Sequence, residues 1–186
     1  MQQWVLGHIV GVLVTSVIGT LVTMLWLWFK SKSYPQNMIL LGLFTIFEAM
    51  MIGTLLAEYS NSGNGILVLK ALLITLGVVI GLTVFTMQSK YDFSGLGPIL
   101  TVALFGFTGF MLVNMFIPFS AGGGMFEYGI TIFGVGLFSL YLVYDTYMIM
   151  NKLEVDEYIL GSLMLYLDII NIFLNILRLI SEAQDH

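Results

Sequence analysis

Six long apolar runs, separated by short polar or glycine-rich breaks, follow one another along the chain. An α-helix needs roughly 20 apolar residues to cross the hydrocarbon core of a bilayer, and each run is about that long. The breaks read KSKSYPQN, SNSGNG, SKYDFSG, PFSAGGG and NKLEVDE, and they are rich in residues that favour turns. The pattern predicts six spanning helices: Val5–Phe29, Met38–Tyr59, Ile66–Gln88, Leu96–Ile117, Met125–Met150 and Tyr158–Ile180.

The short breaks leave no room for linkers between domains. We therefore predict an all-α membrane protein in which residues 1–186 form a single bundle of six hydrophobic helices. Polar side chains of the last helix fall within about 80° of one face: Asp168, Asn171, Asn175 and Arg178. Such a stripe faces protein or water and not lipid, so the last helix either spans the membrane or enters it and returns.

The composition supports the membrane class and excludes several kinds of chemistry. Of the 186 residues, 59% are hydrophobic and only 9% are charged, whereas a soluble domain carries about a quarter charged residues. Cysteine is absent and histidine occurs only at His8 and His186, so no thiolate or zinc site is expected. The net charge of −5 gives no reason to expect nucleic acid as a partner. We expect the lipid bilayer as the surroundings, with no cofactor and no permanently bound metal.

Lysines in the breaks predict the orientation of the chain. Lys30, Lys32, Lys90 and Lys152 lie in the first, third and fifth breaks, and the second and fourth contain no Lys or Arg. Cytoplasmic loops carry an excess of these residues, so the odd breaks are predicted to face the cytosol. No basic residue precedes the first run, which favours a retained helix that starts outside the cytosol over a cleavable signal peptide.

Three carboxylic acids interrupt the apolar runs well inside the predicted helices. Glu48, Asp145 and Asp168 each cost about 2.5–3.5 kcal/mol at mid-helix, and no Lys or Arg is placed near mid-helix to neutralise them. They must be protonated, hydrogen-bond one another or line a water path for cations. A purely structural role, in which each acid satisfies a local hydroxyl or backbone group, remains the alternative.

Asp145 and Asp168 lie on consecutive helices joined by a short loop. Two carboxylates that share a site cannot both ionise cheaply, so the pair can hold a single proton and act as a pH-responsive latch. The predicted helix ends place the two residues about 9 Å apart in depth. Pairing therefore requires a longer fifth helix, a later start of the sixth, or a tilt.

Further polar residues could line an ion pathway. Glu127 begins the fifth helix and Asp156 precedes the sixth, where an acid is often only a cap or a partner of the helix dipole. The other interpretation is an acidic mouth that concentrates cations. With Glu48 and Asn171, these residues form the candidate ion pathway.

Several segments resemble the transmembrane Bax inhibitor motif family, the lifeguard proteins. The resemblance rests on FSLYLVYDTYMIM, followed 23 residues after its Asp by the Asp of LYLDIINIFLNILRLI. FEA in the second helix and GLTVFTMQSKYDFSGLG after the third look most like the Golgi anti-apoptotic subgroup, of host or poxvirus type. The resemblance extends over nearly the whole chain, from about Lys30 to Ile180.

The resemblance implies a helical bundle in which Asp145 and Asp168 form a pH-sensing pair. It also implies a link to calcium leak from Golgi or endoplasmic reticulum stores and to suppression of cell death. Glu48 would be a buried acid of the bundle, and Glu127, Asp156 and Asp168 would be positions to test for cation conduction. We expect two departures from the family: the absence of its first hydrophobic segment, and lysines where some members carry an arginine.

We therefore expect a pH-sensitive calcium leak channel of intracellular membranes that inhibits apoptosis and is not an enzyme. Calcium would be the transported ion, bound transiently at the acidic positions. Expected partners are membrane proteins of the cell-death or calcium-store machinery, or further copies of the chain. The alternatives are a non-conducting membrane interaction protein, a proton-coupled transporter, or an intramembrane aspartyl protease, although the Gly-x-Gly-Asp context of the protease is absent.

Overall fold

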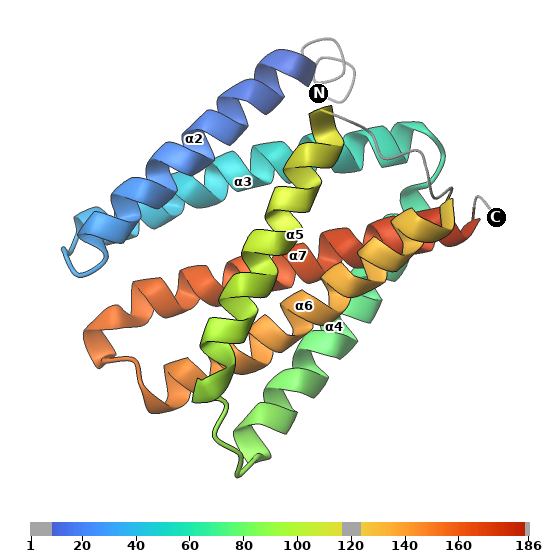
Figure 1. Ribbon diagram of the computed structural model, residues 1–186. Coiled ribbons are helices and arrows are strands. Elements are labelled where there is room, and N and C mark those ends of the chain that lie inside the picture. The colour runs from blue at the N-terminus through green and yellow to red at the C-terminus, as the bar shows by residue number, and fades with distance from the viewer. Residues whose placement is uncertain (1–8, 117–123, 185–186) are drawn as a thin grey trace. The chain divides into compact units, whose positions relative to one another are not determined.

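The computed structural model describes residues 9–116 and 124–184, and the regular structure in these ranges is helical (Figure 1). Short 3-10 helices, η1 (Ser94–Leu96) and η3 (Val155–Glu157), precede two of the long helices. The long helices are α2 (Ile9–Lys30), α3 (Gln36–Asn61), α4 (Gly65–Gln88), α5 (Gly97–Phe116), α6 (Gly124–Asn151) and α7 (Tyr158–Gln184).

Six candidate spans in the described residues are long and apolar enough to cross a membrane, which confirms the predicted all-α membrane class. The predicted helix boundaries agree with the structure to within a few residues. Residues 5–8 of the first prediction and residue 117 of the fourth lie outside the described residues.

The last segment is one continuous helix. α7 has 27 residues, which corresponds to about 40 Å at 1.5 Å per residue. A re-entrant segment would have to turn back inside the membrane, and α7 contains no such break. A continuous helix of this length fits the spanning form, which stays a prediction.

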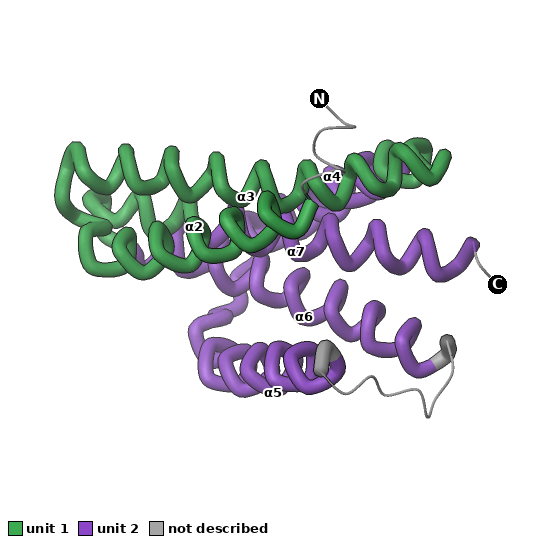
Figure 2. Tube along the Cα trace, turned by 90° about the horizontal axis from the view of Figure 1, so that it is seen from above, with its two compact units in different colours: residues 1–69, 154–163 green, residues 70–153, 164–186 purple. Residues whose placement is uncertain are grey.

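The chain divides into two compact units (Figure 2). Unit 1 contains the described residues up to Leu69 together with Glu154–Leu163, and unit 2 contains Lys70–Leu153 together with the described residues from Met164 onward. The sequence prediction of a single bundle stays a prediction.

In unit 1, α2 and α3 lie side by side and run in opposite directions (Figure 1). Gly19 permits this approach, because the ring of Phe47 occupies the space that a Cβ atom at Gly19 would need. Two buried hydroxyls on α2 bond to their own helix: Ser16 Oγ donates to the Val12 carbonyl and Thr23 Oγ1 to the Gly19 carbonyl, each at 2.6 Å. This local bonding satisfies polar groups where lipid offers no partner.

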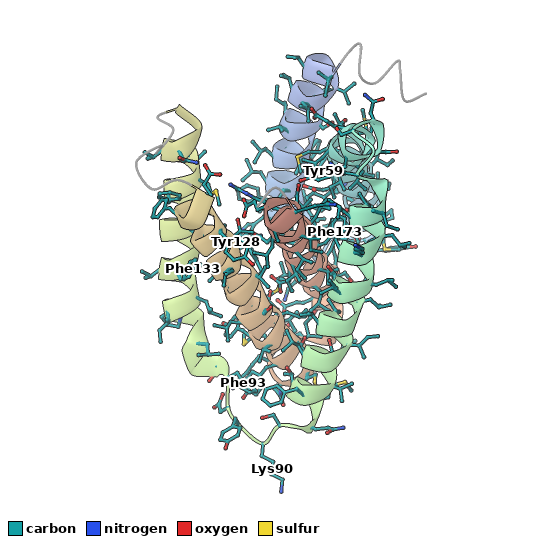
Figure 3. The ribbon with its side chains drawn as sticks, turned by 90° about the vertical axis from the view of Figure 1, so that its right-hand side faces the viewer. Tyr59, Lys90, Phe93, Tyr128, Phe133 and Phe173 are labelled. Atoms are coloured by element: carbon teal, nitrogen blue, oxygen red, sulfur yellow. The ribbon has the colours of Figure 1, made fainter. Side chains whose placement is uncertain are left out.

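In unit 2, aromatic rings pack α5 against α6. The ring centroid of Phe107 lies 6.0 Å from those of Phe133 and Phe138, and the Phe110 centroid lies 5.9 Å from that of Phe126. Figure 3 shows Phe133 and Tyr128 on α6, and Phe93 and Lys90 in the loop at the other end of the unit. These contacts hold α5 beside the part of α6 that leads to Asp145.

Charged side chains join the loops within each unit. In unit 1, Lys32 Nζ lies 3.2 Å from a carboxylate oxygen of Glu154 and of Glu157, and 3.7 Å from one of Asp156. In unit 2, Asp92 of the α4–α5 loop interacts with Lys152 of the α6–α7 connection. Contact between odd breaks is consistent with their placement on one side of the membrane, and the cytosolic orientation itself stays a prediction.

Asp92 also anchors its loop to α6. Its Oδ1 atom accepts a hydrogen bond from the Ser94 backbone N–H at 2.8 Å. Hydrogen bonds from the Ser94 hydroxyl, the Ser94 N–H and the Tyr147 hydroxyl lower the pKa of the Asp92 carboxyl from 3.8 to about 2. The ring of Phe93 packs edge-on against Tyr147, with the centroids 5.8 Å apart.

The close contact at Gly19 predicts that any side chain at this position destabilises the fold. We expect Gly19→Ala to destabilise the protein by about 1–3 kcal/mol, because the Phe47 ring must move to make room. Gly42→Ala on α3 is the matched control, since a Cβ atom there meets nothing within 4 Å. Thermal unfolding in detergent measures both changes, and equal effects on the midpoint would contradict the packing argument.

The lowered pKa of Asp92 predicts that its contribution to stability is lost in acid. The pKa of the Asp92 carboxyl is lower in the folded than in the unfolded state. Its contribution to the stability of the folded state is therefore complete above pH 3.8 and is lost as the pH falls through about 2. Asp92→Asn should therefore lower the unfolding midpoint at neutral pH, and the difference from wild type should vanish at about pH 2. A difference that persists unchanged in acid would show that the carboxylate charge is not what holds the loop.

Candidate functional site

The candidate site is built from two acids on consecutive helices of unit 2. α6 contributes Asp145 and α7 contributes Asp168, and each is only 5% exposed. Their carboxyl groups lie close enough for each to influence the other electrostatically. The structure therefore brings together the two acids that the sequence singled out.

The predicted depth mismatch is smaller in the structure. α6 continues to Asn151, six residues past Asp145, and α7 begins at Tyr158, ten residues before Asp168. The remaining offset of four residues corresponds to about 6 Å along a helix axis. The two carboxyl groups nevertheless interact, so the packing of the two helices absorbs this offset.

A hydrogen bond between two carboxyl groups needs a proton on one of them. The Oδ2 atom of Asp168 is fully buried and has no hydrogen-bond partner in the described part of the chain. A protonated Asp145 is thus a suitable donor for Asp168. An ionised pair would leave two buried like charges without such a bond.

The acid pair lines a pocket of about 310 Å³. The wall is formed by residues of three helices: Leu104 and Thr108 of α5, Phe138, Tyr141 and Asp145 of α6, and Met164, Leu167, Asp168 and Asn171 of α7. None of these lining residues is basic. The polar groups of the wall are carboxyl, amide and hydroxyl groups, which supply the oxygen ligands that hard cations prefer.

The polar stripe of α7 faces α6, as the helix period predicts. Asn171 lines the pocket and donates from Nδ2 to the Leu167 carbonyl at 2.8 Å, a bond that does not use its own amide oxygen. Further along, Asn175 fills the space above Gly134, where a Cβ atom would overlap its amide. The absence of a side chain at Gly134 lets the stripe approach the α6 backbone.

The other predicted pathway residues lie outside this pocket. Glu127 is 18 residues before Asp145 on α6, which is about 27 Å along the helix. It lies 3.9 Å from Arg178 at the opposite end of unit 2. Glu48 and Asp156 belong to unit 1, where the buried Glu48 interacts with the Thr20 hydroxyl and Asp156 lies beside Lys32. In residues 9–116 and 124–184, no three acidic or histidine side chains gather as a metal-binding group.

Some polar contacts of the structure were not predicted from the sequence. Arg178 pairs with Glu182 at 2.7 Å, and the i, i+4 spacing of these two residues could have predicted the contact. The turn at Asp92 could similarly have been predicted, because an Asp side chain often accepts a hydrogen bond from the backbone N–H two residues on. The contacts of Arg178 with Glu127 and of Asp92 with Tyr147 connect separate helices or loops, so no local sequence pattern predicts them.

Comparison with known proteins agrees with the family resemblance of the sequence. The family described as inhibitor of apoptosis-promoting Bax1 matches residues 1–185. Bax inhibitor 1 of Schizosaccharomyces pombe is 39% identical over 174 residues, which cover 94% of this chain and 63% of the relative. LIFEGUARD 4 of Arabidopsis thaliana is 36% identical, with 90% of this chain and 66% of the relative covered.

A viral relative belongs to the subgroup that the sequence resembles. The Golgi anti-apoptotic protein of vaccinia virus is 31% identical over 183 residues, which cover 98% of this chain and 73% of the relative. The chain spans slightly less than two thirds of the length of the yeast and plant relatives. These three relatives are named as inhibitors, lifeguards or anti-apoptotic proteins. The match over nearly all residues shows that the chain belongs to the Bax inhibitor family, also called the Bax1-I family.

Proposed function

We propose that this protein inhibits apoptosis from Golgi or endoplasmic reticulum membranes, as a pH-sensitive leak path for calcium ions. The names of the relatives, among them Bax inhibitor 1 and Golgi anti-apoptotic protein, support the anti-apoptotic part and the Golgi location. The ion path and its gating rest on the chemistry of the acid pair.

The observation that carries the proposal is the buried pair Asp145–Asp168 in a pocket without a basic lining residue. A structural ion pair would need a cation, and here the partner of each acid is the other acid. A shared proton holds α6 to α7 in the closed state. The same carboxyl groups become cation ligands when the proton leaves.

Deprotonation supplies the opening force. Two like charges roughly 4 Å apart repel by about 4 kcal/mol at an effective dielectric constant of about 20. This energy exceeds that of a typical hydrogen bond, about 0.5–1.5 kcal/mol net, so the loss of the proton is enough to separate the side chains. Flux should therefore rise as the pH rises.

The calcium ion itself passes by transient coordination. Asp145, Asp168 and the amide oxygen of Asn171 are the oxygen ligands of the pocket, and carboxylate and carbonyl oxygens suit calcium. Glu127, Glu48 and Asp156 are the remaining acids of the proposed path, at which calcium would gather before or after the gate. Other membrane proteins or further copies of the chain are its proposed partners.

The test is calcium release from vesicles that contain the purified full chain, measured from acidic to mildly alkaline pH. Asp168→Asn and Asp145→Asn should each lower the flux at alkaline pH by more than about tenfold, because an amide cannot ionise and continues to donate to the remaining carboxylate. Both variants should lose the rise of flux with pH. Asp92→Asn, an exposed loop acid of the same unit, is the matched control and should keep it.

Two outcomes would overturn the gating proposal. One is an Asp168→Asn protein that conducts with its pH response intact. The other is protection of cells from apoptosis by the double Asp→Asn variant when its vesicles pass no calcium, which would instead support a non-conducting interaction protein. Cleavage of a transmembrane peptide that either variant abolishes would support a protease.

A further inference from the structure

An apolar groove between α5 and α6 shares none of its lining residues with the acid pocket. It has a volume of about 370 Å³, within the range of small-molecule sites. Its lining includes the small residues Ala103, Gly106 and Gly129 and the rings of Phe107, Phe110 and Phe133. A Cβ atom at Gly106 or Gly129 would meet nothing within 4 Å, so the glycines leave open space and not a tight helix contact.

The groove continues into a polar end. A neighbouring cavity shares Phe110, Phe126 and Ile130 with it and adds Asn114, Glu127 and Arg178. The combined surface is thus apolar along most of its length and charged at one end. Such a surface is complementary to an amphipathic ligand.

The depth of the groove matches one leaflet of a bilayer. Gly106 lies ten residues before the end of α5 at Phe116, which is about 15 Å. Phe133 lies nine residues after the start of α6 at Gly124, which is about 14 Å. Half of the hydrocarbon core is about 15 Å, so the apolar part reaches the midplane while the charged end lies at the membrane surface.

The charges at the polar end select the headgroup. Arg178 Nε bonds Glu182 Oε1 at 2.7 Å, whereas Arg178 Nη2 is 3.9 Å from Glu127, longer than a hydrogen bond. Glu182 Oε2 is buried, with no donor to it in the described part of the chain. Two carboxylates and one guanidinium leave the cluster one unit negative. A lone anionic group is therefore disfavoured, and a head that carries both signs is complementary.

We propose that this groove binds one acyl chain of a zwitterionic phospholipid, with the phosphate at Arg178 and the ammonium group beside Glu127. The arginine offers planar N–H donors to the phosphate, and the carboxylate offers a counter-charge to the ammonium. The site shares Glu127 with the proposed ion path but no residue with the acid pair, and its occupancy is measured by labelling, without reference to ion flux.

The test uses the full chain in phosphatidylcholine vesicles that contain a small fraction of phosphatidylcholine with a photoreactive group on one acyl chain. After irradiation and digestion, labelled peptides should be concentrated around Gly106 and Gly129. Gly106→Leu and Gly129→Leu each fill the groove and should lower this labelling by roughly tenfold, the effect of excluding about two methylene groups. Gly77→Leu on α4, where a Cβ atom also meets open space, is the matched control and should label as wild type does.

The headgroup is tested in the same vesicles. Arg178→Gln should lower phosphatidylcholine labelling several-fold, and Arg178→Lys should retain part of it. A photoreactive fatty acid should label wild type weakly and Glu127→Gln more strongly, because that change removes the excess negative charge.

Three results would overturn the proposal. One is labelling spread evenly over all exposed helix faces, which is the pattern of surrounding lipid. Another is equal labelling of Gly106→Leu, Gly129→Leu and Gly77→Leu proteins with intact helix content by circular dichroism. The third is a groove covered by a second copy of the chain, seen as crosslinks between copies at Gly106.

Discussion

A carboxyl group inside a bilayer has to find its hydrogen-bond partner within the protein, and this constraint organises unit 2. Asp145 and Asp168 are each 5% exposed, and neither has a basic neighbour in the pocket that they line. In the proposed function, each acid depends on the other and on a proton between them. The contact requires α6 and α7 to lie close together, which the small residue Gly134 permits further along the same interface.

Carboxyl groups have different partners at the two ends of unit 2. In the proposed latch at the acid pair, a proton takes the place of a counter-ion. At the other end, near the membrane surface, Glu127 and Glu182 share Arg178, whose long side chain is 39% exposed. The polar stripe of α7 thus runs from the acid pair to the ion pairs of Arg178.

The helices could be predicted from the sequence because the bilayer imposes both a length and an apolar composition on each span. Their ends were less predictable: α3 begins at Gln36 and α7 ends at Gln184, since polar residues continue a helix at the membrane surface. The meeting of Asp145 and Asp168 was a hypothesis that helix ends alone could not decide, because the depth of a side chain also depends on how helices cross. Contacts such as Glu127–Arg178 depend on tertiary structure and leave no trace in local spacing.

The close fit of Asn175 over Gly134 has a mechanical consequence for the neighbouring helices. Gly134 is 11 residues from Asp145, or about 16 Å along α6. If α6 and α7 part at the acids, this tight contact acts as the fulcrum of a lever. A rotation of about 10° there would displace the far carboxyl groups by about 3 Å over that arm, so a small angular change suffices to exchange direct contact for room enough for an ion.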